Sequence, residues 1–177
     1  MAVSMEQVRE LRERTGAGIL ECKKVLEEAN GDIKQAIAVL REKGLKIADK
    51  KKDRVANEGR IDVYIHHDGK KAAIVEVNCE TDFVARNDEF IRLVKELALH
   101  IAGSPDTKYI TREEVPAGEA EAYDAGTPEE YYEKTVLMEQ PFLRNPSETI
   151  AEKVRDTIAK TGENIVVRRF VRYEIGV

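Results

Sequence analysis

The side chains best suited to chemistry in this chain are three histidines and two cysteines. His66 and His67 are adjacent, so on a regular strand their rings point to opposite faces and cannot bind one metal ion. His100 stands alone in an apolar segment, and the sequence contains neither an HExxH motif nor a His/Cys cluster with metal-ligand spacing. We therefore interpret the histidines as surface or partly buried side chains and expect no metal site.

Cys79 and one glycine-rich turn are the remaining candidates for chemistry. The sequence around Cys79 offers no obvious general base, which favours a small buried side chain over a nucleophile. A thiol-dependent enzyme using Cys79 stays an alternative. Gly16-Ala17-Gly18, followed by Lys23 and Lys24, does not fit a phosphate loop, because a helix precedes it and Gly-Lys-Ser/Thr is missing. The sequence thus predicts no catalytic residue, no cofactor and no enzyme.

Composition narrows the classes of partner. Charged residues make up 36% of the 177 residues and the formal net charge is −5, whereas a general nucleic-acid binder needs a basic face. The basic segment from Lys50 to Arg54 leaves RNA binding open, although a solvated linker is favoured there. No stretch resembles a signal peptide or approaches the ~18 apolar residues of a membrane span. Two cysteines without a CxxC pair indicate free thiols in a reducing compartment. We expect a cytoplasmic protein that binds no membrane.

The elements that must position these residues begin with three short helices. Ser4 and Gln7 have the spacing of a capping box, and the first helix should end at the turn Thr15 to Gly18. A second helix over residues 19–29 carries Leu20 among its apolar residues. A third begins at Asp32 and should end at Gly44, a natural C′ residue. The pattern predicts a small three-helix bundle over residues 1–45, followed by a charged linker over 46–58.

The rest of the chain, 59–177, alternates between strand and helix patterns. Two alternating segments, 61–65 and 73–77, flank Asp68-Gly69 and predict a β-hairpin, and a third strand covers 167–175. Helices are expected over 87–102 and from Ser147 to Gly162, with further capping boxes at Thr111/Glu114 and Thr127/Glu130. Residues 104–126 show no clear pattern. The fold class is therefore α+β, with a small antiparallel sheet and helices on one face.

The least ordinary stretch runs from Asn78 to Asn87, between a strand and a long helix. Thr81 can cap a first helical turn, where Asp82 is favourable because of the helix dipole. Phe83 and Val84 then lie on a connection where polar residues are usual. Either both side chains fold back onto the core, or Phe83 is exposed and anchors an interface.

Several segments match one protein family in content and order, and the chain resembles elongation factor Ts from near Met5 to near Ile175. The matching segments are TGAGILECKK at 15–24, NGD at 30–32, EVNCETDFVA at 76–85 and GENIVVRRF at 162–170.

The resemblance implies a protein-binding function. The bundle is similar to a ubiquitin-associated domain that docks on the nucleotide-binding domain of elongation factor Tu, with Lys23 and Lys51 as docking residues. Residues 81–84 (Thr81, Asp82, Phe83 and Val84) match the loop that reaches the Mg²⁺ and nucleotide of this GTPase, where the Phe inserts between side chains. The apolar segment Pro141, Phe142 and Leu143 resembles one that touches another domain of the partner.

The implied activity is guanine-nucleotide exchange on elongation factor Tu, by binding its nucleotide-free form, with no catalytic chemistry and no cofactor. The single sheet-and-helix core resembles the short form of the family, which implies a homodimer and a two-plus-two complex with the partner. The bundle alone would also fit a ubiquitin-associated-like adaptor. That alternative leaves residues 81–84 unexplained.

Overall fold

The computed structural model describes residues 3–176, and its first three helices form the expected bundle. They are α1 (Met5–Thr15), α2 (Ile19–Glu28) and α3 (Ile33–Asp49). Ser4 and Gln7 exchange both hydrogen bonds of the capping box, and Gly16, at φ 66°, ends α1 in the left-handed conformation. The bundle core consists of small and aliphatic side chains: Val8, Leu11, Cys22, Val25, Leu26, Ala29 and Ala36.

Helix α3 does not end at Gly44, so that prediction was wrong. The helix continues to Asp49 and packs against α7 (Ile150–Thr161). A Cβ built on Gly44 would lie 3.9 Å from Asp156 Oδ1 and 4.0 Å from the Ala159 Cβ. Both distances are ordinary van der Waals contacts, so a Cβ would fit here. The packing of α3 against α7 carries the helix through Gly44 and outweighs the ~1 kcal/mol that glycine costs inside a helix. The first residues of the charged segment, as far as Asp49, are therefore helical, and α3 itself extends from the bundle onto α7 of the core.

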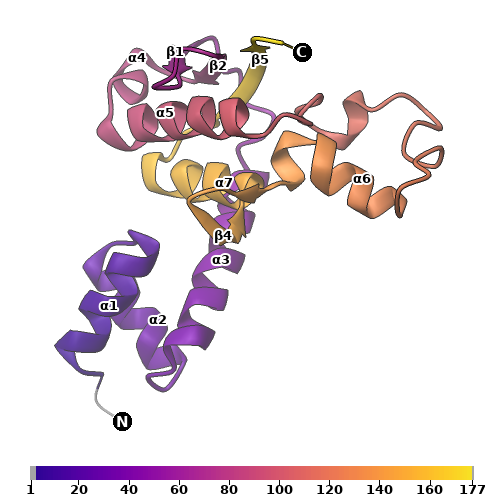
Figure 1. Cartoon of the computed structure of the whole chain (residues 1–177). Helices are drawn as coiled ribbons and strands as arrows, with labels where there is room; N and C mark the ends of the chain where they lie inside the picture. The colour runs from indigo at the N-terminus through magenta and orange to yellow at the C-terminus, as the bar shows by residue number, and fades with distance from the viewer. Residues whose placement is uncertain (1–2, 177) are drawn as a thin grey trace.

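The core is built on one antiparallel sheet in the order β1-β2-β5. Its strands are β1 (Glu58–Ile65), β2 (Lys71–Cys79) and β5 (Val166–Glu174). The hairpin around Asp68-Gly69 is confirmed, with Gly69 at φ 68°. The long helices of the core, α5 (Asp88–Gly103) and α7, lie on one side of this sheet, so the predicted α+β class is confirmed (Figure 1).

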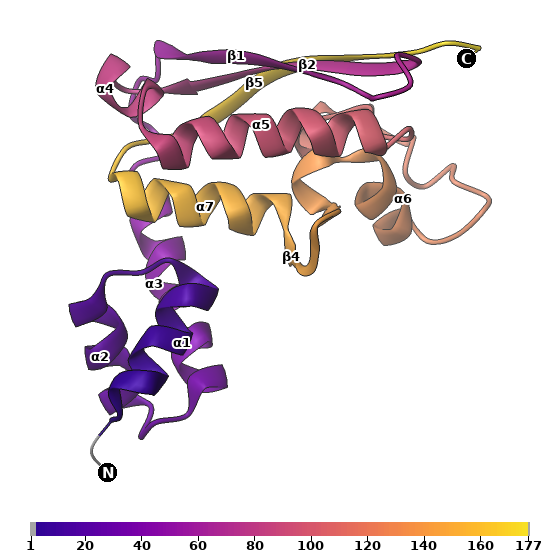
Figure 2. The ribbon, with the colours of Figure 1, turned by 60° about the vertical axis from the view of Figure 1, so that its left-hand side comes forward.

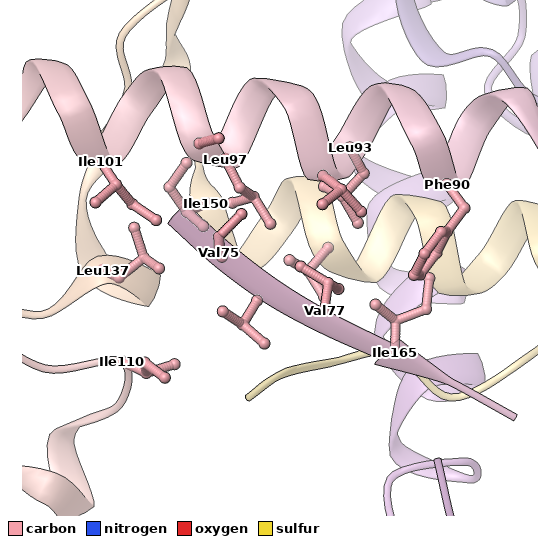
Figure 3. Packing of buried hydrophobic residues seen from close by; sticks show 14 of the residues in the cluster. Val75, Val77, Phe90, Leu93, Leu97, Ile101, Ile110, Leu137, Ile150 and Ile165 are labelled. Carbon is pink, nitrogen blue, oxygen red and sulfur yellow. The ribbon is translucent and has the colours of Figure 1, made fainter. Parts of the chain in front are cut away.

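Three layers stack below one another in Figure 2: the sheet, then α5 (Asp88–Gly103), then α7, with the bundle below them. Figure 3 shows the side chains of Phe90, Leu93, Leu97 and Ile101 on α5. They pack against Val75 and Val77 of β2 and, in the layer below, against Ile150 of α7. These α5 side chains recur at helical spacing on one face, and all are buried.

Helix α7 begins later than predicted. Thr149, and not Ser147, caps it, and both hydrogen bonds of a capping box with Glu152 are present. Ser147 lies in β4 (Asn145–Thr149), which pairs with β3 (Pro141–Phe142) in a small second sheet. The prediction failed because the residues before Thr149 form a strand of a short hairpin, for which the sequence shows no clear pattern.

Residues 104–140 form a lobe beside the C-terminal end of α5 (Figure 1). It contains η1 (Arg112–Glu114), α6 (Pro128–Thr135) and η2 (Leu137–Glu139). The capping box at Thr127 is present. The one predicted at Thr111 is not, because the Glu114 carboxylate accepts instead from the Ile110 N–H at 2.8 Å.

The outer face of the sheet is apolar and exposed. Val63, Ile74 and Val171 lie side by side across the three strands. Ile61, Ile65 and Tyr173 extend the row, and the six side chains are between 36% and 65% exposed. None of the elements described for residues 3–176 covers this upper surface in Figure 2. We call it the outer sheet face.

Candidate functional site

The candidate site is the single helical turn α4 (Asp82–Ala85), between β2 and α5. Thr81 caps it as predicted, accepting from the Val84 N–H with its side-chain hydroxyl at 3.4 Å. Ala85 is buried and Val84 packs against the core. These two residues occupy the inward side of the turn, which leaves Phe83 on the outward side, 82% exposed. The structure thus decides between the two readings of this segment in favour of an exposed Phe83.

Asp82 lies beside Phe83 and is also accessible. Its carboxylate pairs with Arg86 at 3.0 Å, and both side chains are substantially exposed. Exposed pairs of this kind contribute little to stability, about 0–1 kcal/mol, because water screens them. Asp82 can therefore exchange Arg86 for a partner at small cost.

Glu163 fixes the start of the α4 turn from the far end of the sequence. One carboxylate oxygen accepts from the N–H groups of Glu80 and Thr81, at 3.1 and 3.0 Å. The other accepts from the Thr81 hydroxyl at 2.6 Å. No role for Glu163 follows from its sequence pattern, because its partners are 82 and 83 residues away. The only local signal is an acidic residue directly after the helix-ending Gly162.

Asn164 connects this point to the segment that follows α3. It is 3% exposed, and its side-chain amide donates to the carbonyls of Arg54 and Lys52, at 2.8 and 3.2 Å. Its backbone N–H donates to the Glu80 carboxylate at 2.7 Å. The turn Gly162–Asn164 therefore holds both the α4 turn and the end of the charged segment.

Lys51, a predicted docking residue, belongs to the same assembly. Its ammonium group donates to the Gly162 carbonyl, so part of its hydrogen-bonding capacity is used within the chain. Arg54 lies 3.5 Å from the Glu80 carboxylate. Two basic residues of the 50–54 segment thus have internal partners, which weakens the RNA-binding alternative. The docking role of Lys51 stays a prediction.

Cys79 has the properties of a structural thiol. It is fully buried and donates to the Thr81 carbonyl at 3.2 Å. Burial, with a contribution from the Glu163 carboxylate, raises the pKa of Cys79 to about 11. A thiolate is then scarce at neutral pH, so this cysteine is a poor nucleophile. Within residues 3–176, no group of three His, Cys, Asp or Glu side chains is arranged to hold a metal ion.

The N-terminal end of α2 is a second accessible surface. Lys23 is exposed and lies 4.0 Å from Glu27. Leu20, expected to be one of the apolar residues of this helix, points outward and is 85% exposed, and Ile19 beside it is 50% exposed. The exposed apolar pair could form the centre of a docking surface, with the lysine at its polar rim. Leu20 and Ile19 were missed as candidates because an apolar residue on a helix normally predicts core.

The segment Pro141–Leu143 divides into exposed and buried residues. Phe142 is 3% exposed and packs inside the core, with the Lys153 ammonium 4.4 Å from its ring centre. Pro141 and Leu143 are exposed. His100 holds the segment, because its Nδ1 accepts from the Leu143 N–H at 3.3 Å. This segment lies near the C-terminal end of α5 and α4 precedes the N-terminal end, so the 16-residue helix, about 24 Å long, separates them.

Comparison with known proteins identifies the family. The family model described as "Elongation factor TS" matches residues 4–122. A protein named elongation factor Ts from Herpetosiphon aurantiacus is 51% identical over 197 aligned positions, covering 99% of this chain and 99% of that protein. Those from Thermoanaerobacter sp. X514 and Geobacter sulfurreducens are 49% and 46% identical, covering 98% and 99% of this chain and 95% and 91% of those proteins. Among the helices described for the chain, none is long and apolar enough to cross a membrane. With a matched model over more than half of its length and relatives that align end to end, the chain belongs to the elongation factor Ts family.

Proposed function

We propose that this protein accelerates the release of GDP from elongation factor Tu by binding the nucleotide-free form of that GTPase. Membership of the family supports a nucleotide-exchange role and confirms that the chain is not an enzyme. The observation that carries the site-level proposal is Phe83, an aromatic side chain 82% exposed on a turn whose backbone is held in place.

Exchange of this kind requires no covalent chemistry. A factor that binds the empty GTPase more tightly than the GDP form must weaken GDP by the same factor, because the two affinities are linked. A bound Mg²⁺ offsets much of the charge of the nucleotide's phosphates, so displacing its ligands slightly removes much of the nucleotide's affinity. We assign this displacement to residues 81–84, with Phe83 inserting and Asp82 beside it.

A single inserted side chain supplies only part of the coupling, so the contact is distributed. We assign docking to the α2 surface, where Lys23 offers charge and Leu20 apolar area. Lys51 contributes through the segment after α3. Pro141 and Leu143 contact a further domain of the partner, and Phe142 supports them from within the core. In this proposal the bundle (1–45) docks, the segment 46–58 connects, and the core (59–177) carries exchange.

The outer sheet face supports the proposed homodimer. Its apolar residues lie across all three strands, and such a face on a monomer would be left in water. Two copies packed face to face, about 10 Å apart, would bury it as the sheets of a β-sandwich do. We therefore place the second copy on the outer sheet face, which gives a two-plus-two complex with the partner. Light scattering that shows only a monomer, alone and with partner, would count against it.

The exchange proposal is tested by stopped-flow measurement of fluorescent GDP release from elongation factor Tu, with and without this protein. Release that accelerates with protein concentration and then saturates supports it. Release that is unchanged at concentrations where the two proteins form a complex would show that the chain binds without promoting exchange.

A further inference from the structure

We propose that Glu163 is the positioning residue for Phe83: it presents the aromatic side chain to the partner without touching the partner itself. The inference rests on the proposed exchange function for its kinetic consequence. Its structural part, that one carboxylate fixes the α4 turn, concerns the protein alone.

The first step is that α4 cannot hold itself in place. It has four residues, and a helix this short is unstable on its own because nucleation fixes several residues for few hydrogen bonds. Phe83 gains little from packing, since 82% of its surface is exposed. The direction of Phe83 is therefore set by the backbone of the turn and by whatever holds that backbone.

The second step is that Glu163 carries the cap of the turn. The Thr81 hydroxyl donates to Glu163 at 2.6 Å and accepts from the Val84 N–H at 3.4 Å. Glu163 thereby selects the rotamer in which Thr81 caps α4. It also accepts the N–H groups of Glu80 and Thr81. Hydrogen bonds to an ionised acceptor are roughly twice as strong as neutral ones, so this carboxylate is a strong constraint.

The third step is that Glu163 is itself held. It stands between Gly162, which ends α7 in the left-handed conformation at φ 76°, and Asn164, which is buried and bonded to two backbone carbonyls. A carboxylate on a fixed turn transmits that fixed position to its partners. The position of the α4 turn is therefore fixed relative to the end of α7 and to the segment that leads to the bundle.

The test compares Glu163→Gln with a matched control, Glu130→Gln. Glu130 also accepts from the backbone N–H and hydroxyl of one threonine, Thr127, at 2.7 and 3.2 Å, but it does so in the lobe. At saturating concentration of Glu163→Gln, GDP release should slow about tenfold, with the half-saturating concentration changed less than about twofold. The Glu130→Gln variant should keep the saturating rate.

A double-mutant cycle with Phe83→Ala tests whether Glu163 acts through Phe83. In the Phe83→Ala background, Glu163→Gln should change the saturating rate less than about twofold, because the side chain that it positions is gone. Two results would overturn the proposal: reductions of the saturating rate that multiply in the double variant, or an effect of Glu163→Gln on the half-saturating concentration alone.

Hydrogen exchange of the full-length protein without partner separates this inference from the exchange function. In Glu163→Gln, the amides of Glu80, Thr81 and Val84 should exchange about tenfold faster, with the amides of α6 unchanged. Glu130→Gln should show the reverse. If wild-type protein fails to accelerate GDP release, the exchange proposal falls, and these amides still decide whether Glu163 fixes the turn. Unchanged protection at all three amides would refute that role.

Discussion

Replacing Phe83 by alanine is expected to slow exchange strongly while leaving the fold of the protein intact. Phe83 is 82% exposed, so its truncation should change the free energy of unfolding by less than about 0.5 kcal/mol. Phe90, which is fully buried on α5, provides the contrast, since its truncation should cost about 3–5 kcal/mol.

The loss on the partner can be estimated from the exposed area. A phenylalanine buries about 150–250 Å² and gains about 25 cal/mol per Å². Covering the exposed 82% of Phe83 therefore corresponds to about 3–5 kcal/mol, of which the alanine Cβ retains a part. A remaining loss of about 2–4 kcal/mol is typical of interface hot spots. It corresponds to a slowing of about 30-fold to 1,000-fold, if the contact forms as GDP leaves.

Stopped-flow release of fluorescent GDP at increasing factor concentration measures this effect. The saturating rate should fall by at least about 30-fold while the half-saturating concentration changes less than about threefold, because docking elsewhere is intact. Val55→Ala is the control, since it removes another side chain that is 72% exposed, outside the α4 turn. An unchanged saturating rate with Phe83→Ala would remove insertion of this side chain from the mechanism.

Four further outcomes are expected. Ile74→Lys, at the centre of the outer sheet face, should convert a dimer to a monomer in light scattering, and an unchanged mass would move the interface elsewhere. Cys22 and Cys79 are buried and burial raises the pKa of both, to about 11 for Cys79; they should resist a thiol reagent at pH 8 until guanidinium unfolds the protein. Burial lowers the pKa of His100, so as the pH falls below about 6.5 the unfolded state takes up a proton first and the free energy of unfolding falls. The melting temperature of the wild type should therefore fall more steeply with decreasing pH than that of His100→Gln, and equal slopes would contradict this. Lys23→Ala should raise the half-saturating concentration for exchange, and more so at low ionic strength, where charges are less screened; a salt-independent change would show that its charge is not what docks.

Local patterns were sufficient for most of the fold. The capping boxes at Ser4 and Thr127 and the Asp68-Gly69 hairpin depend on neighbours in the sequence, and all three are present. Gly44 was misread because α3 continues through it and packs against α7, whose residues lie more than a hundred positions away in the sequence. Local preference is a weak signal where tertiary packing competes with it.

The candidate site shows the same division. Thr81 as the cap of α4 follows from residue type and position, and the cap is present. Glu163 has no such signal, because its three hydrogen bonds join distant segments. Phe142 also could not be separated from Leu143 by sequence, since both are apolar, and only the fold shows that one is buried and the other exposed.

Helix α3 has a consequence for how the two proposed contact surfaces act together. Its 17 residues, about 26 Å of rigid rod, run from the bundle to the layer formed by α7. A protein with two contact surfaces on a stiff spacer behaves as a bivalent ligand: once one surface engages, the other is presented at a high effective concentration. A flexible tether of the same length would spread the second surface over a large volume. Because the helix is unbroken, the avidity depends on the fixed spacing of the two surfaces as well as on the strength of each contact.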